Sequence, residues 1–321
     1  TVAASGLRNI PELLDLYGYR KPDVLGMELD VLPTNLYFQY CAAFRQARVD
    51  DISYELRIIR AVKSAYEIEK IRAAAHFSDK VAARVPMLLR EGETEVALAG
   101  ALEGYARRLG HQGIVRMRLW GSELFYGHLM AGDAAAVASY LASPTGGDGV
   151  SAAVGQGAGY RKIRRNEPVL VDYVFALDGY ISDHARIFSL GLLPEELQAA
   201  HAAMLEIQEV IMTQARPGVI TGELYELMVD LAGKKGYGDY FMGTGDKRIR
   251  FTGHGVGLEL VEFPFIAKGQ RLALEAGMII ALEPKTIFPG IGVVGMENTH
   301  LVTENGLESL TTFPDTITVL P

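Results

Sequence analysis

Residues 168–190 read PVLVDYVFALDGYISDHARIFSL, a strand-rich stretch from which the rest of the fold can be inferred. Asp178-Gly179 separates two apolar runs and is a strong signal for the two-residue turn of a β-hairpin. The runs before and after the turn are rich in Val, Ile, Phe and Tyr, which favour strands. We therefore predict an antiparallel pair of strands over residues 168–177 and 180–190.

Each strand of this hairpin carries an acidic residue in an apolar setting. With the turn at Asp178-Gly179, Asp172 pairs with Ala185. Asp183 lies two residues from that partner, so it projects from the same face as Asp172, at a diagonal backbone distance of about 7–8 Å. An acid in a buried strand must be paired, protonated or bound to a metal, because a lone buried carboxylate is too costly.

A second hairpin repeats this arrangement over residues 278–288 and 292–303. Glu283 ends its first apolar strand, and Glu297 lies on the returning strand. The sequence shows no matching buried run of Arg or Lys near the four acids, and Arg186 alone cannot neutralise them. Because clustered carboxylates repel one another unless cations lie among them, we predict two divalent metal ions at this site.

His254 completes the predicted ligand set. Glycines flank it on both sides, in the segment Thr252-Gly253-His254-Gly255-Val256-Gly257, and allow the backbone to approach closely. An imidazole combined with carboxylates suits Mn, Co, Zn or Fe. The predicted metal ligands are therefore Asp172, Asp183, His254, Glu283 and Glu297.

The pattern of the chain changes near residue 60. Residues 1–60 alternate short helices and strands, an α/β pattern too small to stand alone, whereas residues 66–89 are apolar at helical spacing. We expect residues 1–60 to be the end of a small N-terminal domain and residues 61–321 to be the metal-binding domain. The chain begins at Thr1 within what reads as a domain, so we expect a longer parent protein.

The long part contains an internal similarity. One predicted helix runs from Gly92 to Gly110 and another of equal length from Gly218 to Gly236. Either two helices of similar length happen to end at a C-cap glycine, or the chain holds two duplicated αβ halves. We expect an α+β fold with pseudo-twofold halves, a curved and mainly antiparallel sheet, helices outside and the metals on the inner face.

Composition limits the possible functions. The 321 residues carry a net charge of −8, which argues against nucleic acid as a ligand because phosphate binding needs a basic face. The single cysteine, Cys41, cannot form an intrachain disulfide. The apolar runs are shorter than the ~20 residues that span a bilayer, and no charged leader with an apolar core opens the chain. We expect a soluble, cytoplasmic protein.

These residues and their spacing resemble the pita-bread metallopeptidases: aminopeptidase P, prolidase, methionine aminopeptidase and their relative creatinase. Asp172 and Asp183 stand eleven apart, and His254 lies in a Gly-His-Gly-Val-Gly-Leu-Glu segment. Glu283-Pro284 precedes Glu297-Asn298 by fourteen residues. The resemblance covers about residues 60–321, and residues 1–60 resemble the end of a creatinase-type N-terminal domain, which favours the prolidase and aminopeptidase P branch.

The resemblance implies a pita-bread fold and an activity. Asp183 and Glu297 would bridge two metal ions, Asp172 would bind one ion, and His254 with Glu283 would bind the other. A hydroxide between the ions would attack the amide carbonyl of a short peptide, with Glu283 as proton shuttle. The implied protein is an Xaa-Pro aminopeptidase or dipeptidase, a homodimer that uses Mn before Co, Zn or Fe.

Three positions depart from the family pattern. Ser139 and Val261 stand where the family has histidines, and Gly295 stands where it has an arginine. The missing histidines normally bind substrate and stabilise the transition state, and losing such a donor typically costs ~10²–10³ in rate. His128, just before the altered stretch, is the candidate catalytic substitute. Residues 131–160, rich in Gly, Ala and Ser, are predicted to be a long functional loop.

Two alternatives to a peptidase stay open. The first is a member of the same fold that binds a peptide or a protein and has lost turnover, which the three replacements motivate. The second is a creatinase-like carbon–nitrogen hydrolase acting on a non-peptide amide. The complete metal-ligand set favours the peptidase, because a retired site need not keep five ligands.

Overall fold

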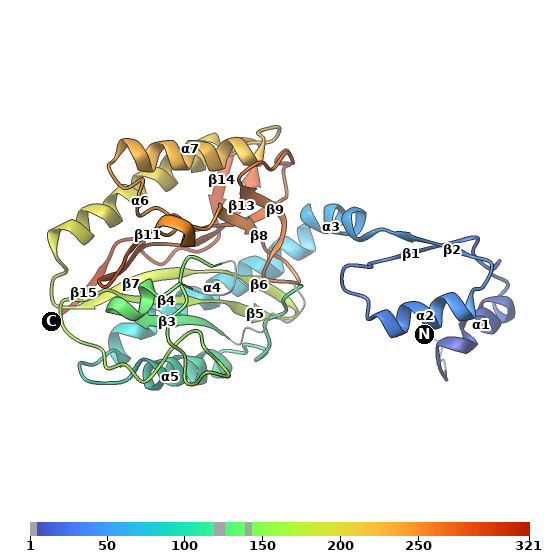
Figure 1. Cartoon of the computed structure of the whole chain (residues 1–321), viewed down its shortest axis with the longest axis horizontal. Helices are drawn as coiled ribbons and strands as arrows, with labels where there is room; N and C mark the ends of the chain where they lie inside the picture. Colours follow the sequence, from blue (N-terminus) through green and yellow to red (C-terminus); the bar gives the residue numbers. More distant parts are fainter. Residues whose placement is uncertain (1–4, 119–125, 139–142) are drawn as a thin grey trace. The chain divides into compact units, whose positions relative to one another are not determined.

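The computed structural model describes residues 5–118, 126–138 and 143–321. Figure 1 shows its helices and strands along the chain. The chain divides into two compact units, Thr1–Arg60 and Ala61–Pro321. Among the described residues, none of the helices combines the length and apolar character needed to cross a membrane.

The smaller unit is a short α/β segment. Its two strands pair in parallel, with Val24 opposite Arg48, and a helix connects them, as the alternating sequence pattern predicts. Its elements in order are η1 (Leu7–Asn9), α1 (Ile10–Leu16), β1 (Val24–Met27), α2 (Thr34–Ala43), β2 (Arg48–Asp51) and α3 (Ser53–Ala61).

The larger unit consists of two halves, each of which begins with two helices and continues with strands. The first half holds α4 (Ala65–Leu88), α5 (Glu95–Arg108), β3 (Gly127–Ala131), η2 (Gly132–Ala136), β4 (Val169–Tyr173), β5 (Phe175–Leu177), β6 (Tyr180–Ser182) and β7 (Ala185–Leu190). The second half and the end of the chain hold α6 (Glu195–Gln214), α7 (Thr221–Lys234), η3 (Gly245–Lys247), β8 (Phe251–Gly255), β9 (Glu262–Ala267), β10 (Ile279–Leu282), β11 (Lys285–Phe288), β12 (Gly292–Gly295), β13 (Asn298–Thr303), β14 (Gly306–Ser309) and β15 (Thr318–Leu320).

Sheet topology confirms the duplication. One sheet has the order β15-β7-β4-β3, and the other has the order β14-β13-β10-β8-β9. The antiparallel trio β7-β4-β3 therefore corresponds to β13-β10-β8, and each trio carries a two-stranded ribbon, β5-β6 or β11-β12. The two helices of similar length predicted from glycine spacing, α5 and α7, occupy equivalent places in the two halves.

Both predicted hairpins form, and the first has the predicted register. Leu177 pairs with Tyr180 beside the Asp178-Gly179 turn, and Asp172 pairs with Ala185. Each hairpin is interrupted once, so that an outer ribbon separates from the sheet, while the same register continues on both sides of the interruption.

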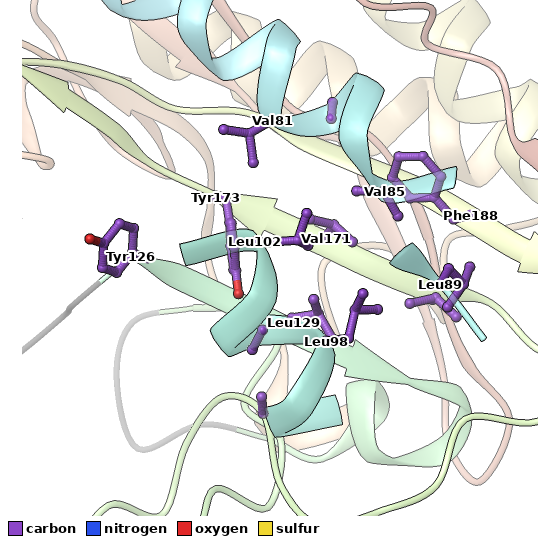
Figure 2. Packing of buried hydrophobic residues seen from close by; sticks show 14 of the residues in the cluster. Val81, Val85, Leu89, Leu98, Leu102, Tyr126, Leu129, Val171, Tyr173 and Phe188 are labelled. Carbon is purple, nitrogen blue, oxygen red and sulfur yellow. The ribbon is translucent and has the colours of Figure 1, made fainter. Parts of the chain in front are cut away.

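Helices cover the outer faces of the sheets (Figure 1). The first turn of α4 is fixed by a capping box, in which Ser64 Oγ accepts from the backbone N–H of Glu67 and the Glu67 carboxylate accepts from the N–H of Ser64. Figure 2 shows side chains of α4 and α5 packed on strands of the first sheet. Val85 of α4 and Leu102 of α5 lie in this cluster with Val171 of β4. The second sheet packs in the same way against α6 and α7.

His111 is a buried polar residue of the first half. Its Nε2 lies 3.1 Å from the carbonyl oxygen of Val174, and its Nδ1 accepts from the N–H of Gly113 at 2.8 Å. These partners require a neutral ring that is protonated at Nε2. Burial lowers the pKa of His111 to about 4.

The free energy of unfolding should therefore depend on pH through His111. Its folded pKa lies below the unfolded value of about 6.5, so its contribution is complete above about pH 6.5 and is lost as the pH falls toward 4. His111→Gln removes this titration, and we expect its unfolding free energy to fall less between pH 7 and pH 5 than that of the wild type, by up to about 2 kcal/mol. Urea unfolding at both pH values measures the difference, with His76→Gln, an exposed histidine of α4, as the control. An unchanged pH dependence in His111→Gln would contradict the assignment.

Candidate metal site

The four predicted acids lie where the hairpins are interrupted. Asp172 is next to the end of β4, and Asp183 lies between β6 and β7. Glu283 lies between β10 and β11, and Glu297 lies between β12 and β13. Equivalent junctions of the two halves therefore supply the acidic residues, as the sequence pattern predicts.

A direct backbone contact joins the two hairpins at this point. The N–H of Ala185 donates to the carbonyl oxygen of Glu297 at 3.2 Å, and the N–H of Glu297 donates to Ala185 at 3.1 Å. Because Asp172 pairs with Ala185 in the first sheet, this pair of hydrogen bonds brings the acids of both halves together.

His254 reaches the same place from β8, where the flanking glycines allow close backbone packing. A Cβ atom on Gly253 would lie 2.5 Å from the carbonyl oxygen of Ala281, and one on Gly255 would lie 2.1 Å from that of Phe263. The predicted reason for these glycines, close approach of neighbouring backbone, is therefore confirmed.

The imidazole of His254 is oriented for a ligand. Its Nδ1 lies 3.1 Å from the carbonyl oxygen of Gly255, so Nδ1 carries the proton and Nε2 keeps its lone pair. Nε2 lies 3.7 Å from Asp183 Oδ2 and 3.8 Å from Glu297 Oε1. A histidine held by a backbone carbonyl in this way is the usual arrangement around a protein-bound metal.

Three residues form a donor set that fits one divalent ion. Ligand atoms of Asp183, His254 and Glu297 all lie within 4.8 Å of one another, and the three residues are buried. Two carboxylates and one neutral imidazole suit first-row transition metals. Among the described residues, this is the group of metal-binding side chains that is close enough to share an ion.

The sequence shows no buried run of Arg or Lys to match the acids and offers Arg186 as the one candidate cation, but a single lysine lies among the acids. The ammonium of Lys285 donates to Asp172 Oδ2 at 2.9 Å, to Glu283 Oε2 at 2.9 Å and to Glu297 Oε2 at 2.7 Å. The side chain of Lys285 is 1% exposed. Two of the five predicted ligands, Asp172 and Glu283, therefore contact a lysine rather than joining the triad around His254.

The alternation of side chains along a strand predicts that Lys285 lies near the acids, although it does not belong to a run of basic residues. Side chains alternate between the two faces of a strand, so residue 285 shares a face with Glu283, two positions earlier. Lys285 begins β11, directly opposite Gly295 of β12. Glu283 lies two residues before Lys285 along the chain, and Glu297 lies two residues after Gly295, the partner of Lys285.

Gly295 has a structural role beside Lys285. Its φ of 137° is a conformation that favours glycine, and an added Cβ would lie 2.3 Å from the carbonyl oxygen of Pro284 and 3.1 Å from Lys285 Cγ. The replacement of the family arginine by glycine thus coincides with space that the lysine requires.

Electrostatics follow from burial and from these contacts. Burial opposes the charge of Lys285, but the carboxylates of Asp172, Glu283 and Glu297 outweigh it and raise the pKa of Lys285 well above its ordinary value. Burial, and then the charge of Asp172, raises the pKa of Asp183 to about 6. The cluster therefore has more negative charge than Lys285 alone can balance.

Arg186 does not lie among the acid side chains. It is 1% exposed, and it donates to the carbonyl oxygens of Ala185 and Glu297 and to those of Phe313 and Pro314. One of its nitrogens also bonds the side chains of Asn298 and Asp315. Arg186 thus holds the end of the chain against the junction of the two hairpins.

His128 lies beside the acid cluster. It pairs directly with Asp172 across β3 and β4, so the two side chains share a face. The ring is buried, and Nε2 has no hydrogen-bond partner among the described residues. Burial lowers the pKa of His128, and the charge of Asp172 together with a side-chain hydrogen bond between His128 and Gln156 opposes that shift.

Gln156 belongs to the glycine-rich stretch after β3. The buried carboxylate of Glu95 accepts from the N–H of Ala131 at 2.8 Å and from that of Gly159 at 3.0 Å, which ties the stretch to α5 and β3. The predicted loop thus contributes a residue next to His128. Ser139 lies outside the described residues, and Val261 packs against an apolar cluster that includes Val174.

Two glycine substitutions separate the steric role of Gly295 from backbone conformation. Gly290 also has a positive φ, of 74°, but an added Cβ there meets nothing within 4 Å. We expect Gly290→Ala to lower the free energy of unfolding by about 1–2 kcal/mol, the cost of the left-handed conformation. Gly295→Ala should lose a further ~1–3 kcal/mol, because the methyl group overpacks the strand pair.

Urea unfolding of both variants measures this difference. Equal losses in Gly290→Ala and Gly295→Ala would mean that the contact with Pro284 and Lys285 is not tight.

Known proteins are similar to this chain in sequence. The Xaa-Pro dipeptidase of Pyrococcus furiosus is 31% identical over 266 residues, which cover 82% of this chain and 66% of that protein. An uncharacterized peptidase of Bacillus subtilis is 25% identical over 315 residues, 98% of this chain and 79% of that protein. The chain therefore spans about two thirds to four fifths of these relatives.

Solved structures confirm the pita-bread fold. The X-Pro aminopeptidase of Thermotoga maritima matches with a TM-score of 0.83 at 24% identity, over 100% of this chain and 81% of that one. The Xaa-Pro dipeptidase of Bacillus anthracis matches with a TM-score of 0.81 at 25% identity, over 99% of this chain and 80% of that one.

A match over most of the larger unit shows the family. Residues 69–304 match metallopeptidase family M24, and they include both hairpins, His254 and the four acids. Members of this family are metal-dependent peptidases, in agreement with the donor set around His254. The chain belongs to metallopeptidase family M24.

Proposed function

We propose that this protein is a metal-dependent hydrolase that cleaves Xaa-Pro bonds in short peptides, as an aminopeptidase or dipeptidase. The observation that carries the proposal is the position of His254 Nε2, 3.7 Å from Asp183 Oδ2 and 3.8 Å from Glu297 Oε1 in a buried site. The similarity to a relative named Xaa-Pro dipeptidase, at 31% identity, supports the substrate class.

The donor set fits one ion well and the predicted second ion poorly. Asp183, His254 and Glu297 would hold a divalent ion, with Mn the first candidate and Co, Zn or Fe next. Such an ion acts as a Lewis acid toward an amide carbonyl and activates water at neutral pH. The predicted second ion would need Asp172, Glu283 and Glu297, whose oxygens contact Lys285.

The remaining residues of the site have roles set by their positions. Glu283 is the candidate proton shuttle, and Lys285 at 2.9 Å fixes its carboxylate. His128 is the candidate for the missing histidines, because its Nε2 is buried and has no partner among the described residues. There it can donate a hydrogen bond to the oxyanion of an amide under attack. Homodimer formation rests on the family resemblance and a cytoplasmic location on the sequence composition, and both stay predictions.

Peptide binding without turnover is the second candidate function. The observation that favours it is the lysine inside the acid cluster, together with Val261 and Gly295 at positions where the family has polar residues. A retired enzyme could keep the fold and still bind peptides in the same place. The non-peptide amide hydrolase stays a third possibility without an observation of its own.

Metal removal and reconstitution test the proposal. We expect the metal-free protein to be inactive and the protein reloaded with Mn, Co, Zn or Fe to hydrolyse Xaa-Pro dipeptides or tripeptides, because the ion supplies the Lewis acid. Bound metal and hydrolysis are measured on the same samples. Metal binding without turnover on any Xaa-Pro substrate would favour the binding role, and turnover that survives complete metal removal would contradict the proposal.

The variant His254→Ala tests the metal ligand directly. It removes the single nitrogen of the triad, so we expect weaker metal binding and a loss of ~10²-fold or more in kcat/KM. His76→Ala, at an exposed histidine of α4, is the matched control and should behave as the wild type. Unchanged metal affinity in His254→Ala would exclude this residue as a ligand.

A further inference from the structure

The ammonium of Lys285 has three hydrogen-bond donors, and three carboxylates accept them. Asp172, Glu283 and Glu297 each place one oxygen between 2.7 and 2.9 Å from Nζ. A lysine ammonium has three donors and no acceptor, so its hydrogen-bonding capacity is complete in this position.

We propose that Lys285 is a built-in cation that takes the place of a second metal, so that the site binds a single divalent ion through Asp183, His254 and Glu297. This inference rests on the metal binding in the proposed function. In this arrangement Asp172 and Glu283 bind the lysine, and the site holds one metal ion and one ammonium group instead of two metal ions.

Glu297 connects the two cation positions. Its Oε1 lies 3.8 Å from His254 Nε2, on the side of the triad. Its Oε2 lies 2.7 Å from Lys285 Nζ. One carboxylate thus divides its two oxygens between the ion position and the ammonium, in the way that a bridging carboxylate serves two metals.

A second ion and the ammonium cannot share these oxygens. A metal ion needs carboxylate oxygens at about 2.0–2.2 Å, and the oxygens available on that side already surround Nζ. An ammonium has no lone pair with which to join the coordination, and two cations on the same oxygens would repel each other in a buried site.

Lys285 has no ready route out of the cluster. Its side chain is 1% exposed, and its partner across the ribbon is Gly295. A side chain on residue 295 would collide with the backbone of Pro284 and Lys285. The glycine is therefore needed for Lys285 to keep this position. Two independent features of the structure, the carboxylate contacts and the space at residue 295, therefore support a fixed ammonium.

Counting metal ions per chain tests the inference on the wild-type protein. The protein is saturated with Mn(II), freed of excess ion and analysed for manganese content, and its paramagnetic resonance spectrum is recorded. We expect one ion per chain and the spectrum of an isolated Mn(II). Two ions per chain with a coupled spectrum would overturn the inference, and this wild-type result needs no variant to fold.

Removing the lysine should open the second position. We expect Lys285→Gly to bind two Mn(II) ions per chain, because Asp172, Glu283 and one oxygen of Glu297 are released. Lys63→Met is the matched control, because Lys63 is also buried and pairs with Glu262 at 3.1 Å, outside the triad; it should keep one ion. A folded Lys285→Gly variant that still binds one ion would overturn the inference.

Hydrolysis of an Xaa-Pro dipeptide, measured on the same samples, separates this inference from the proposed function. An active wild type with two ions overturns the single-ion site and leaves the peptidase standing. A wild type with one ion and no turnover supports the single-ion site and contradicts the peptidase. A wild type that binds no ion overturns both.

Discussion

The contact between buried carboxylates and a buried cation is the constraint on which the rest of the site depends. Four acids meet where the two hairpins join, and four like charges in a buried place repel one another unless positive charge lies among them. Lys285 supplies one positive charge through three hydrogen bonds. Asp183, the remaining acid, and the other oxygen of Glu297 converge on His254, which is where a divalent ion would be held.

The duplicated fold places the acids of both halves next to one another. Each half contributes one interrupted hairpin, and the paired hydrogen bonds between Ala185 and Glu297 join the interruptions. Arg186 reinforces that junction by donating to backbone oxygens on both sides of it and to the end of the chain. The helices pack on the outer faces of both sheets, so the site is set by strand register rather than by flexible loops.

Strand patterns made the hairpins and the acids predictable. The Asp178-Gly179 turn fixed the pairing of Asp172 with Ala185, and glycines on both sides of His254 correctly indicated close backbone approach. The function of Lys285 was predictable in principle, because two-residue alternation places it on the face of Glu283. A run of basic residues is the wrong pattern to expect near these acids, because the ammonium of one buried lysine can satisfy three carboxylates.

Other features could not be derived from the sequence alone. The contacts of Arg186 with Phe313 and Pro314 join residues more than a hundred positions apart, and no local pattern specifies them. In the sequence, Gly295 is a glycine at a position where the family has an arginine. Its role depends on the strand pairing that places it opposite Lys285. The hydrogen bond between Gln156 and His128 likewise depends on how the glycine-rich stretch returns to β3.

Anomalous diffraction from crystals of the manganese-loaded protein locates each ion and the lysine in one experiment, and therefore distinguishes a single-ion site from a two-ion site. We expect a single anomalous peak bounded by Asp183, His254 and Glu297, with density for Lys285 Nζ among Asp172, Glu283 and Glu297. Two peaks, with Lys285 displaced from the carboxylates, would contradict the single-ion site.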